Sequence, residues 1–119
     1  LQKDIAAAEF QRKSALSITL PEFPSHPALA TVRQSIERVA ETANDNEFRR
    51  LCSTRANEMM AEYERMRALL GRPESHLSPD ELAKVSRFNA SGLDALDLLA
   101  VVGWYENVGL MLSREARRR

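Results

Sequence analysis

The sequence has few of the residues that build turns, disulfides and metal sites. Its 119 residues include only four glycines, five prolines, four phenylalanines, two tyrosines and one tryptophan. Chains built from β-strands need many turns and many aromatic residues, so this composition argues against an all-β fold. The single cysteine, Cys52, excludes an intrachain disulfide and a zinc site with several cysteine ligands, and it is typical of a reducing compartment.

The chain also lacks an excess of charge of either sign and any long apolar run. Seventeen basic and seventeen acidic side chains cancel, so no net field attracts the protein to nucleic acid or to an anionic membrane. The longest apolar run, residues 98–105, is far shorter than the roughly 20 residues of a membrane-spanning helix. We therefore expect no membrane insertion within this chain.

The N-terminus gives a limited indication of location. Residues 1–4 lack the charged-then-apolar pattern of a signal peptide, which together with the single cysteine favours a cytoplasmic protein. The first residue, Leu1, is not a methionine, so we expect a fragment of a longer chain. The missing upstream part could carry further elements, even a membrane anchor.

Strong helix formers are what the sequence has in abundance. Ala, Leu, Arg and Glu are the most frequent residues. We predict a single all-α domain over residues 1–119, built as a compact bundle of about five helices. The connecting segments are short, so neighbouring helices should run antiparallel. The basic end, residues 113–119, is expected to fray.

The first three helices are predicted from the spacing of apolar residues. A first helix is expected over residues 1–17, and the segment 20–27, which contains three prolines, ends it. A second helix should begin at Pro27 with His26 near its cap, because proline suits the first helical position. The third helix, about 47–70, is the longest, and its apolar residues recur at alternating intervals of three and four.

The last two helices are predicted from terminal signals. Ser78 followed by Pro79 and Glu81 forms a capping box, which predicts a short helix starting at Pro79. A final helix is expected over about residues 93–117, with its cap at 91–92.

The final helix carries the only tryptophan and should be the centre of the bundle. Its apolar residues point in nearly every helical direction between 96 and 111, so we predict that its neighbours largely enclose it. Glu106 beside the aromatic pair is interpreted either as a salt-bridge partner inside the bundle or as part of a recognition surface. Methionine-rich stripes suit adaptable helix binding, although at this spacing they more often form core. The predicted partner-binding residues are Met59, Tyr63, Met66, Trp104, Tyr105 and Glu106.

No catalytic residue, metal site or cofactor is predicted. His26 and His76 lie in proline-containing connectors. Glu22 and Asp80 stand four residues from them, but neither pair lies within one predicted helix, so this spacing does not aim two ligands at one ion. Cys52 lies on an apolar stripe without a nearby base, so it is interpreted as a small buried residue. Asp97 is interpreted as part of an acidic first turn facing water rather than as a general acid.

One feature of the sequence opposes a function in nucleic-acid binding, and another supports it. The helices predicted at 79–90 and from 93 onward resemble a helix-turn-helix pair in layout, but Asp94 and Asp97 would face the phosphates with the wrong sign. A basic end could still hold a phosphate backbone, although it also matches the negative end of its own helix dipole. The possible phosphate contacts are Arg114, Arg117, Arg118 and Arg119.

The sequence as a whole favours a binding role over catalysis. We expect a non-enzymatic protein–protein interaction module with a regulatory, adaptor or assembly role that associates with itself as a homodimer. One alternative is a nucleic-acid-associated regulator that uses the basic C-terminus. A second is the cytosolic domain of a membrane-tethered protein.

Overall fold

The computed structural model describes residues 14–118, and these residues form an all-α fold. Helices account for 76% of the described residues, and no strand occurs among them. This confirms the predicted class, although the described part has four α-helices where about five were expected. The helices and the two short 3-10 turns are η1 (Pro27–Leu29), α2 (Ala30–Thr42), α3 (Asp45–Leu70), η2 (Glu74–His76), α4 (Pro79–Ala90) and α5 (Ala95–Arg117).

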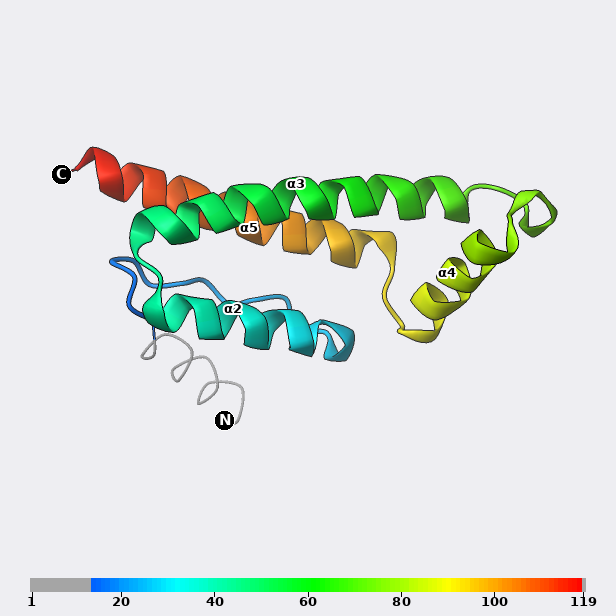
Figure 1. The fold of residues 1–119 in the computed structure, drawn as a ribbon, viewed down its shortest axis with the longest axis horizontal. Coiled ribbons are helices and arrows are strands. Elements are labelled where there is room, and N and C mark those ends of the chain that lie inside the picture. The colour runs from blue at the N-terminus through cyan, green and yellow to red at the C-terminus, as the bar shows by residue number, and fades with distance from the viewer. Residues whose placement is uncertain (1–13, 119) are drawn as a thin grey trace.

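The two long helices, α3 and α5, lie side by side and antiparallel and form the spine of the molecule (Figure 1). Helix α2 runs along one side of this pair, and α4 projects from the end at which α3 finishes (Figure 1). The molecule measures 55 × 34 × 19 Å, with a radius of gyration of 16.5 Å. A compact chain of this length would have a radius of about 13.5 Å. The expectation of a compact bundle was therefore wrong in shape, because the short helix α4 docks only at one end of the spine.

The caps explain where the helices begin. Ser78 and Glu81 form the predicted capping box at the start of α4. Asn44 caps α3 in the same way, so this helix begins two residues earlier than expected. Helix α5 begins later than expected, because Asp94 accepts a hydrogen bond from the Asp97 N–H and Asp97 accepts one from the Asp94 N–H. Its cap is therefore an aspartate pair, and not residues 91–92.

The predicted first helix, residues 1–17, falls mostly outside the described residues. Its described end, Ser14–Ser17, is not helical. The Ala15 N–H donates to the Ala40 carbonyl at 2.8 Å, and the Ser17 N–H donates to Asp45 Oδ1 at 2.9 Å. These long-range partners replace the hydrogen bonds that a helix would make within itself, so this part of the prediction was wrong.

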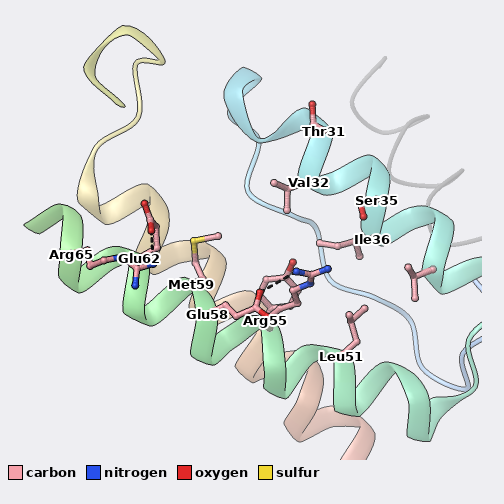
Figure 2. Close-up of a pocket in the computed structure, with 12 residues that line it drawn as sticks. Thr31, Val32, Ser35, Ile36, Leu51, Arg55, Glu58, Met59, Glu62 and Arg65 are labelled. Carbon is pink, nitrogen blue, oxygen red and sulfur yellow. Dashed lines mark hydrogen bonds and ion pairs between the residues drawn. The ribbon is translucent and has the colours of Figure 1, made fainter. Parts of the chain in front are cut away.

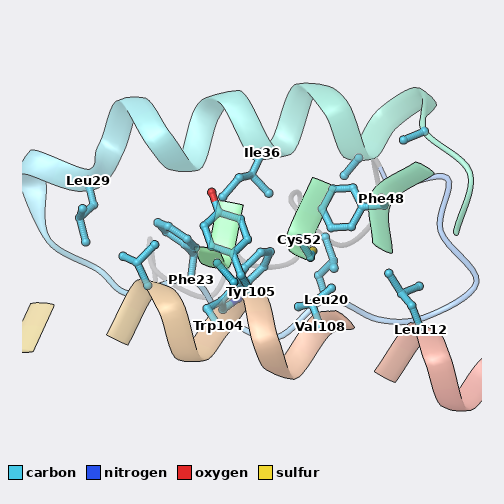
Figure 3. Close-up of a cluster of buried hydrophobic side chains, with 14 residues drawn as sticks. Leu20, Phe23, Leu29, Ile36, Phe48, Cys52, Trp104, Tyr105, Val108 and Leu112 are labelled. Atoms are coloured by element: carbon cyan, nitrogen blue, oxygen red, sulfur yellow. The ribbon is translucent and has the colours of Figure 1, made fainter. Parts of the chain in front are cut away.

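The proline-rich segment, predicted as a simple connector, contributes to the core. Leu20 and Phe23 are buried, and the Phe23 ring meets the Trp104 ring edge to face, with centroids 5.2 Å apart. The Trp104 indole N–H donates to the Pro21 carbonyl at 3.0 Å. Figure 3 shows these side chains between α2 and α5, together with Tyr105. The segment therefore acts as a strap that covers the tryptophan and satisfies its one polar atom.

A second, smaller cluster attaches α4. Met66 of α3, Val85 of α4 and Leu98 of α5 are buried together at the end of the spine. Met59 packs against both this cluster and the main core. A single ion pair between the helices, Lys84 Nζ to Glu62 Oε1 at 3.2 Å, supplements the apolar contact.

Candidate functional site

One face of α5 is open to solvent and carries apolar residues. The exposed residues recur at alternating intervals of four and three, which keeps them on one side of a helix. We call this surface the outer face of α5; it consists of Leu96, Ala100, Gly103, Asn107, Leu110 and Arg114. Leu96 is 69% exposed and Leu110 is 54% exposed. The expectation of a largely enclosed final helix was therefore wrong for this face, because α2, α3 and the strap cover only the opposite side.

The outer face has the pattern of a helix-pairing seam. Alternating intervals of three and four are those of a heptad repeat, in which apolar residues meet a second helix. Ala100 and Gly103 are small, and a Cβ added at Gly103 would have no atom within 4 Å. Small residues at such positions let two helix backbones approach closely. Asn107 interrupts the apolar stripe, as a polar residue does where it fixes the register of a coiled coil.

The two ends of α5 carry opposite charge. Asp94 and Asp97 lie at its N-terminal end, and Arg114 and Arg117 lie in its last turn. Each group matches the local sign of the helix dipole. Within residues 14–118, Arg114 and Arg117 make no ion pair, whereas Arg118 lies 3.7 Å from Glu115. Arg119, the fourth predicted phosphate contact, lies outside the described residues.

The six predicted partner-binding residues do not form one surface. Trp104, Tyr105 and Met66 are buried, at 5%, 3% and 1% exposure. The indole is held by the strap, and its ring also meets Tyr105 edge to face at 5.6 Å. Met59 and Tyr63 are half-buried, and only Glu106 is exposed. Trp104 and Tyr105, which were predicted to bind a partner, are therefore core residues. The exposed residues of α5 lie on a different face of the helix.

A groove between α2 and α3 brings part of that set to the surface. It encloses about 560 Å³ and is lined by Ile36 and Val39 of α2, by Leu51 and Met59 of α3, and by Tyr105 (Figure 2). Two ion pairs of α3, Arg55–Glu58 at 3.0 Å and Arg65–Glu62 at 2.7 Å, form its charged rim (Figure 2). The groove is apolar at its floor and carries charges of both signs at its edge.

A second groove, between α3 and α5, adjoins the outer face. It encloses about 570 Å³, and Leu110 and Glu106 line it on the α5 side. Its residues on α3 include Arg50, Ser53 and Asn57. Because Leu110 belongs both to this groove and to the outer face, the open surface of α5 continues onto α3.

The other candidate residues have structural roles. His26 caps η1, since its Nδ1 accepts the Ala28 N–H at 3.0 Å, and its Nε2 lies 3.2 Å from the Gly92 carbonyl oxygen. His76 lies in η2 and is exposed. Cys52 is fully buried, and burial raises the pKa of its thiol to about 12. The part of the chain that the structure describes has no group of three or more potential metal ligands.

Helix α5 is also the one helix among residues 14–118 that is long and apolar enough to cross a membrane. Its best window has a mean hydropathy of 1.3. Core helices of soluble proteins have the same length and composition, and 39% of this window is buried against the rest of the molecule. Length and hydropathy alone therefore do not distinguish a membrane helix from a helix that packs against protein.

No protein-family model, curated protein or solved structure matches this chain significantly.

Proposed function

We propose that this chain is a non-enzymatic protein–protein interaction module that associates with a second copy of itself. One observation carries the proposal: the outer face of α5 exposes Leu96 and Leu110 at heptad spacing on a helix whose opposite side is core. Exposed apolar residues that follow the repeat of a helix seam are typical of association surfaces. The role would be regulatory, adaptor or assembly, according to what the dimer connects.

The leucines supply the main driving force in this proposal. Removing a leucine side chain from water stabilises a complex by roughly 1.5–3 kcal/mol. In a homodimer each leucine is buried twice, once in each copy. Ala100 and Gly103, which lie between Leu96 and Leu110, add little area but allow close packing of the helices.

Analytical ultracentrifugation over a range of concentrations tests the proposal directly. The wild-type protein should sediment as a dimer at high concentration, and the double variant Leu96→Gln/Leu110→Gln should sediment as a monomer. Both leucines are exposed in the isolated chain, so the variant should keep its helical circular dichroism. The loss of two buried leucines should raise the dissociation constant by at least about a hundredfold.

Leu70 provides the matched control. It is 41% exposed at the end of α3, away from the outer face of α5. Leu70→Gln should therefore dimerise like the wild type. A wild-type protein that stays monomeric at all concentrations, or a double variant that dimerises normally, would contradict the proposal.

A nucleic-acid-associated regulator is the main rival, and the exposed Arg114, Arg117 and Arg118 are its basis. It requires an affinity for duplex DNA or RNA that falls steeply as salt rises, because phosphate binding releases counterions. Fluorescence anisotropy with labelled duplexes at several salt concentrations separates the two functions. We expect no binding at physiological salt. A tethered cytosolic domain, the second alternative, is compatible with self-association.

A further inference from the structure

The outer face of α5 also carries information about the orientation of its partner. Its residues also differ in size along the helix: the small Ala100 and Gly103 are followed by the larger Asn107 and Leu110. In a parallel pair each residue would meet its own copy, so small residues would oppose small ones and leave a gap. Well-packed helix seams place a large side chain against a small one.

We propose that two copies pack α5 against α5 in antiparallel orientation, with Leu110 of each copy over Ala100 of the partner subunit. The proposal rests on the self-association proposed above and specifies its geometry. In the same register, Asn107 lies over Gly103 of the partner subunit and Leu96 lies against the stem of the partner's Arg114. Every large residue of the seam then faces a small or flexible one.

This register also uses nearly the whole helix. The two-fold axis falls next to Tyr105, close to the middle of α5 (Ala95–Arg117). A shift by one heptad in either direction would leave about two turns of each helix without a partner. The seam is about 30 Å long, at 1.5 Å of rise per residue.

The charges at the two ends of α5 favour the same orientation. In the antiparallel pair the acidic end of one copy, with Asp94 and Asp97, lies beside the basic end of the other. Arg114 and Arg117, which have no ion-pair partner within residues 14–118, gain acidic neighbours. In a parallel pair the arginines would face the partner's arginines and the aspartates the partner's aspartates. Opposite charges across an interface fix orientation because the wrong arrangement is repulsive.

Disulfide trapping tests the geometry with two single variants, Ala100→Cys and Leu110→Cys. Facing residues come within the roughly 7 Å between Cα atoms that a disulfide can bridge. Two copies of position 100, or two copies of position 110, lie about 15 Å apart along the antiparallel helices. Under mild oxidation, a mixture of the two variants should therefore give a covalent dimer, with on the order of tenfold more product than either variant alone.

The controls distinguish a wrong geometry from an absent dimer. The wild type should give no covalent dimer, because its one cysteine, Cys52, is fully buried. Crosslinking of Ala100→Cys alone would establish a parallel pair and overturn the inference. If the mixture does not crosslink although the variants still sediment as dimers, the helices pair in a different register and the inference is wrong. A wild type that does not dimerise in the centrifuge would instead refute the proposed function itself.

Discussion

At the scale of single residues, the two glycines of α5 differ in what surrounds them. A Cβ added at Gly109 would lie 3.9 Å from the Cβ of Cys52, an ordinary van der Waals distance, so α3 leaves room for a methyl group there. Gly103 lies on the open side of the same helix, where an added Cβ would meet no atom within 4 Å beyond the backbone of its own helix. The two glycines thus have the same local conformation and different surroundings.

Substituting each glycine with alanine separates these roles. Both Gly103→Ala and Gly109→Ala should stabilise the isolated chain by up to about 1 kcal/mol, because glycine is a poor helix former. Only Gly103→Ala should weaken the dimer, by roughly tenfold in dissociation constant, because its methyl group would crowd the partner's Asn107. Thermal unfolding of the variants and sedimentation measure the two effects. Equal dimer affinities for the two variants would argue against Gly103 as part of the seam.

The thiol of Cys52 is predicted to be unreactive in the folded protein. Burial raises the pKa of its thiol to about 12, so almost no thiolate exists near neutral pH, and its side chain has no exposed surface. A thiol-reactive dye at about pH 8 should label the native chain far more slowly than the chain unfolded in urea. Leu70→Cys serves as the positive control, since Leu70 is 41% exposed and does not belong to the proposed seam. Fast labelling of the native wild type would show that the core opens at Cys52.

At the scale of elements, α4 is attached to the spine by a small apolar cluster of its own. The small cluster around Met66 and the Glu62–Lys84 ion pair join it to the spine, and Glu81 of α4 pairs with Arg72 of the loop after α3. Partial burial tends to raise the pKa of Glu62, but hydrogen bonds and charges from Arg65 and Lys84 outweigh it and lower the pKa below 4.5. The ionised carboxylate therefore stabilises the folded state above pH 4.5, and this contribution is lost as the pH falls below that value.

The substitution Glu62→Gln should remove the part of the loss of folding stability at acidic pH that comes from this carboxylate. At neutral pH it should lower stability by about 0.2–1 kcal/mol, the usual range for a partly exposed ion pair. Below the carboxyl pKa the variant and the wild type should converge. Thermal unfolding followed by circular dichroism at neutral and acidic pH measures the difference. Glu58→Gln is the control, because Glu58 pairs with Arg55 on α3 itself and does not reach α4.

Helix boundaries were predictable from this sequence wherever a cap lay next to its helix. Ser78 and Glu81 predicted the start of α4, because all parts of a capping box lie within four residues. The strap was not predictable, because Pro21 and Phe23 acquire their role only by contact with Trp104, about 80 residues away. Alternation of Leu20 and Phe23 with prolines was the one local sign that this segment packs.

The open face of α5 was missed for a related reason. Its leucines, glycine and alanine are as apolar as the buried residues beside them, so the sequence indicated a helix enclosed on all sides. Which side remains open depends on how many neighbouring helices the chain supplies, and this is a property of the whole arrangement. Trp104 and Tyr105 drew attention as recognition residues, although large aromatic side chains are equally suited to a core.

At the scale of the whole molecule, the shape suggests incomplete coverage of the spine. The molecule is 19 Å thick, which corresponds to about two helix diameters, and α2 with the strap covers only one side of the α3–α5 pair. Two copies joined through α5 would place a second layer on the open side. The pair would then resemble other helical bundles, in which apolar helices are covered by neighbours on both sides.

The proposed dimerisation through α5 would make the stability of the fold depend on protein concentration. For a dimer that dissociates as it unfolds, the free energy of unfolding rises by about 1.4 kcal/mol per mole of dimer for each tenfold rise in protein concentration. The midpoint of thermal unfolding should therefore rise by roughly 3–5 °C per tenfold step above the dissociation constant. The double variant Leu96→Gln/Leu110→Gln should unfold at one temperature at all concentrations, because it lacks the seam. Trp104, the only tryptophan and 5% exposed, reports the transition by fluorescence in both proteins. A wild-type midpoint that stays constant over a hundredfold range would mean that the outer face of α5 remains open in solution.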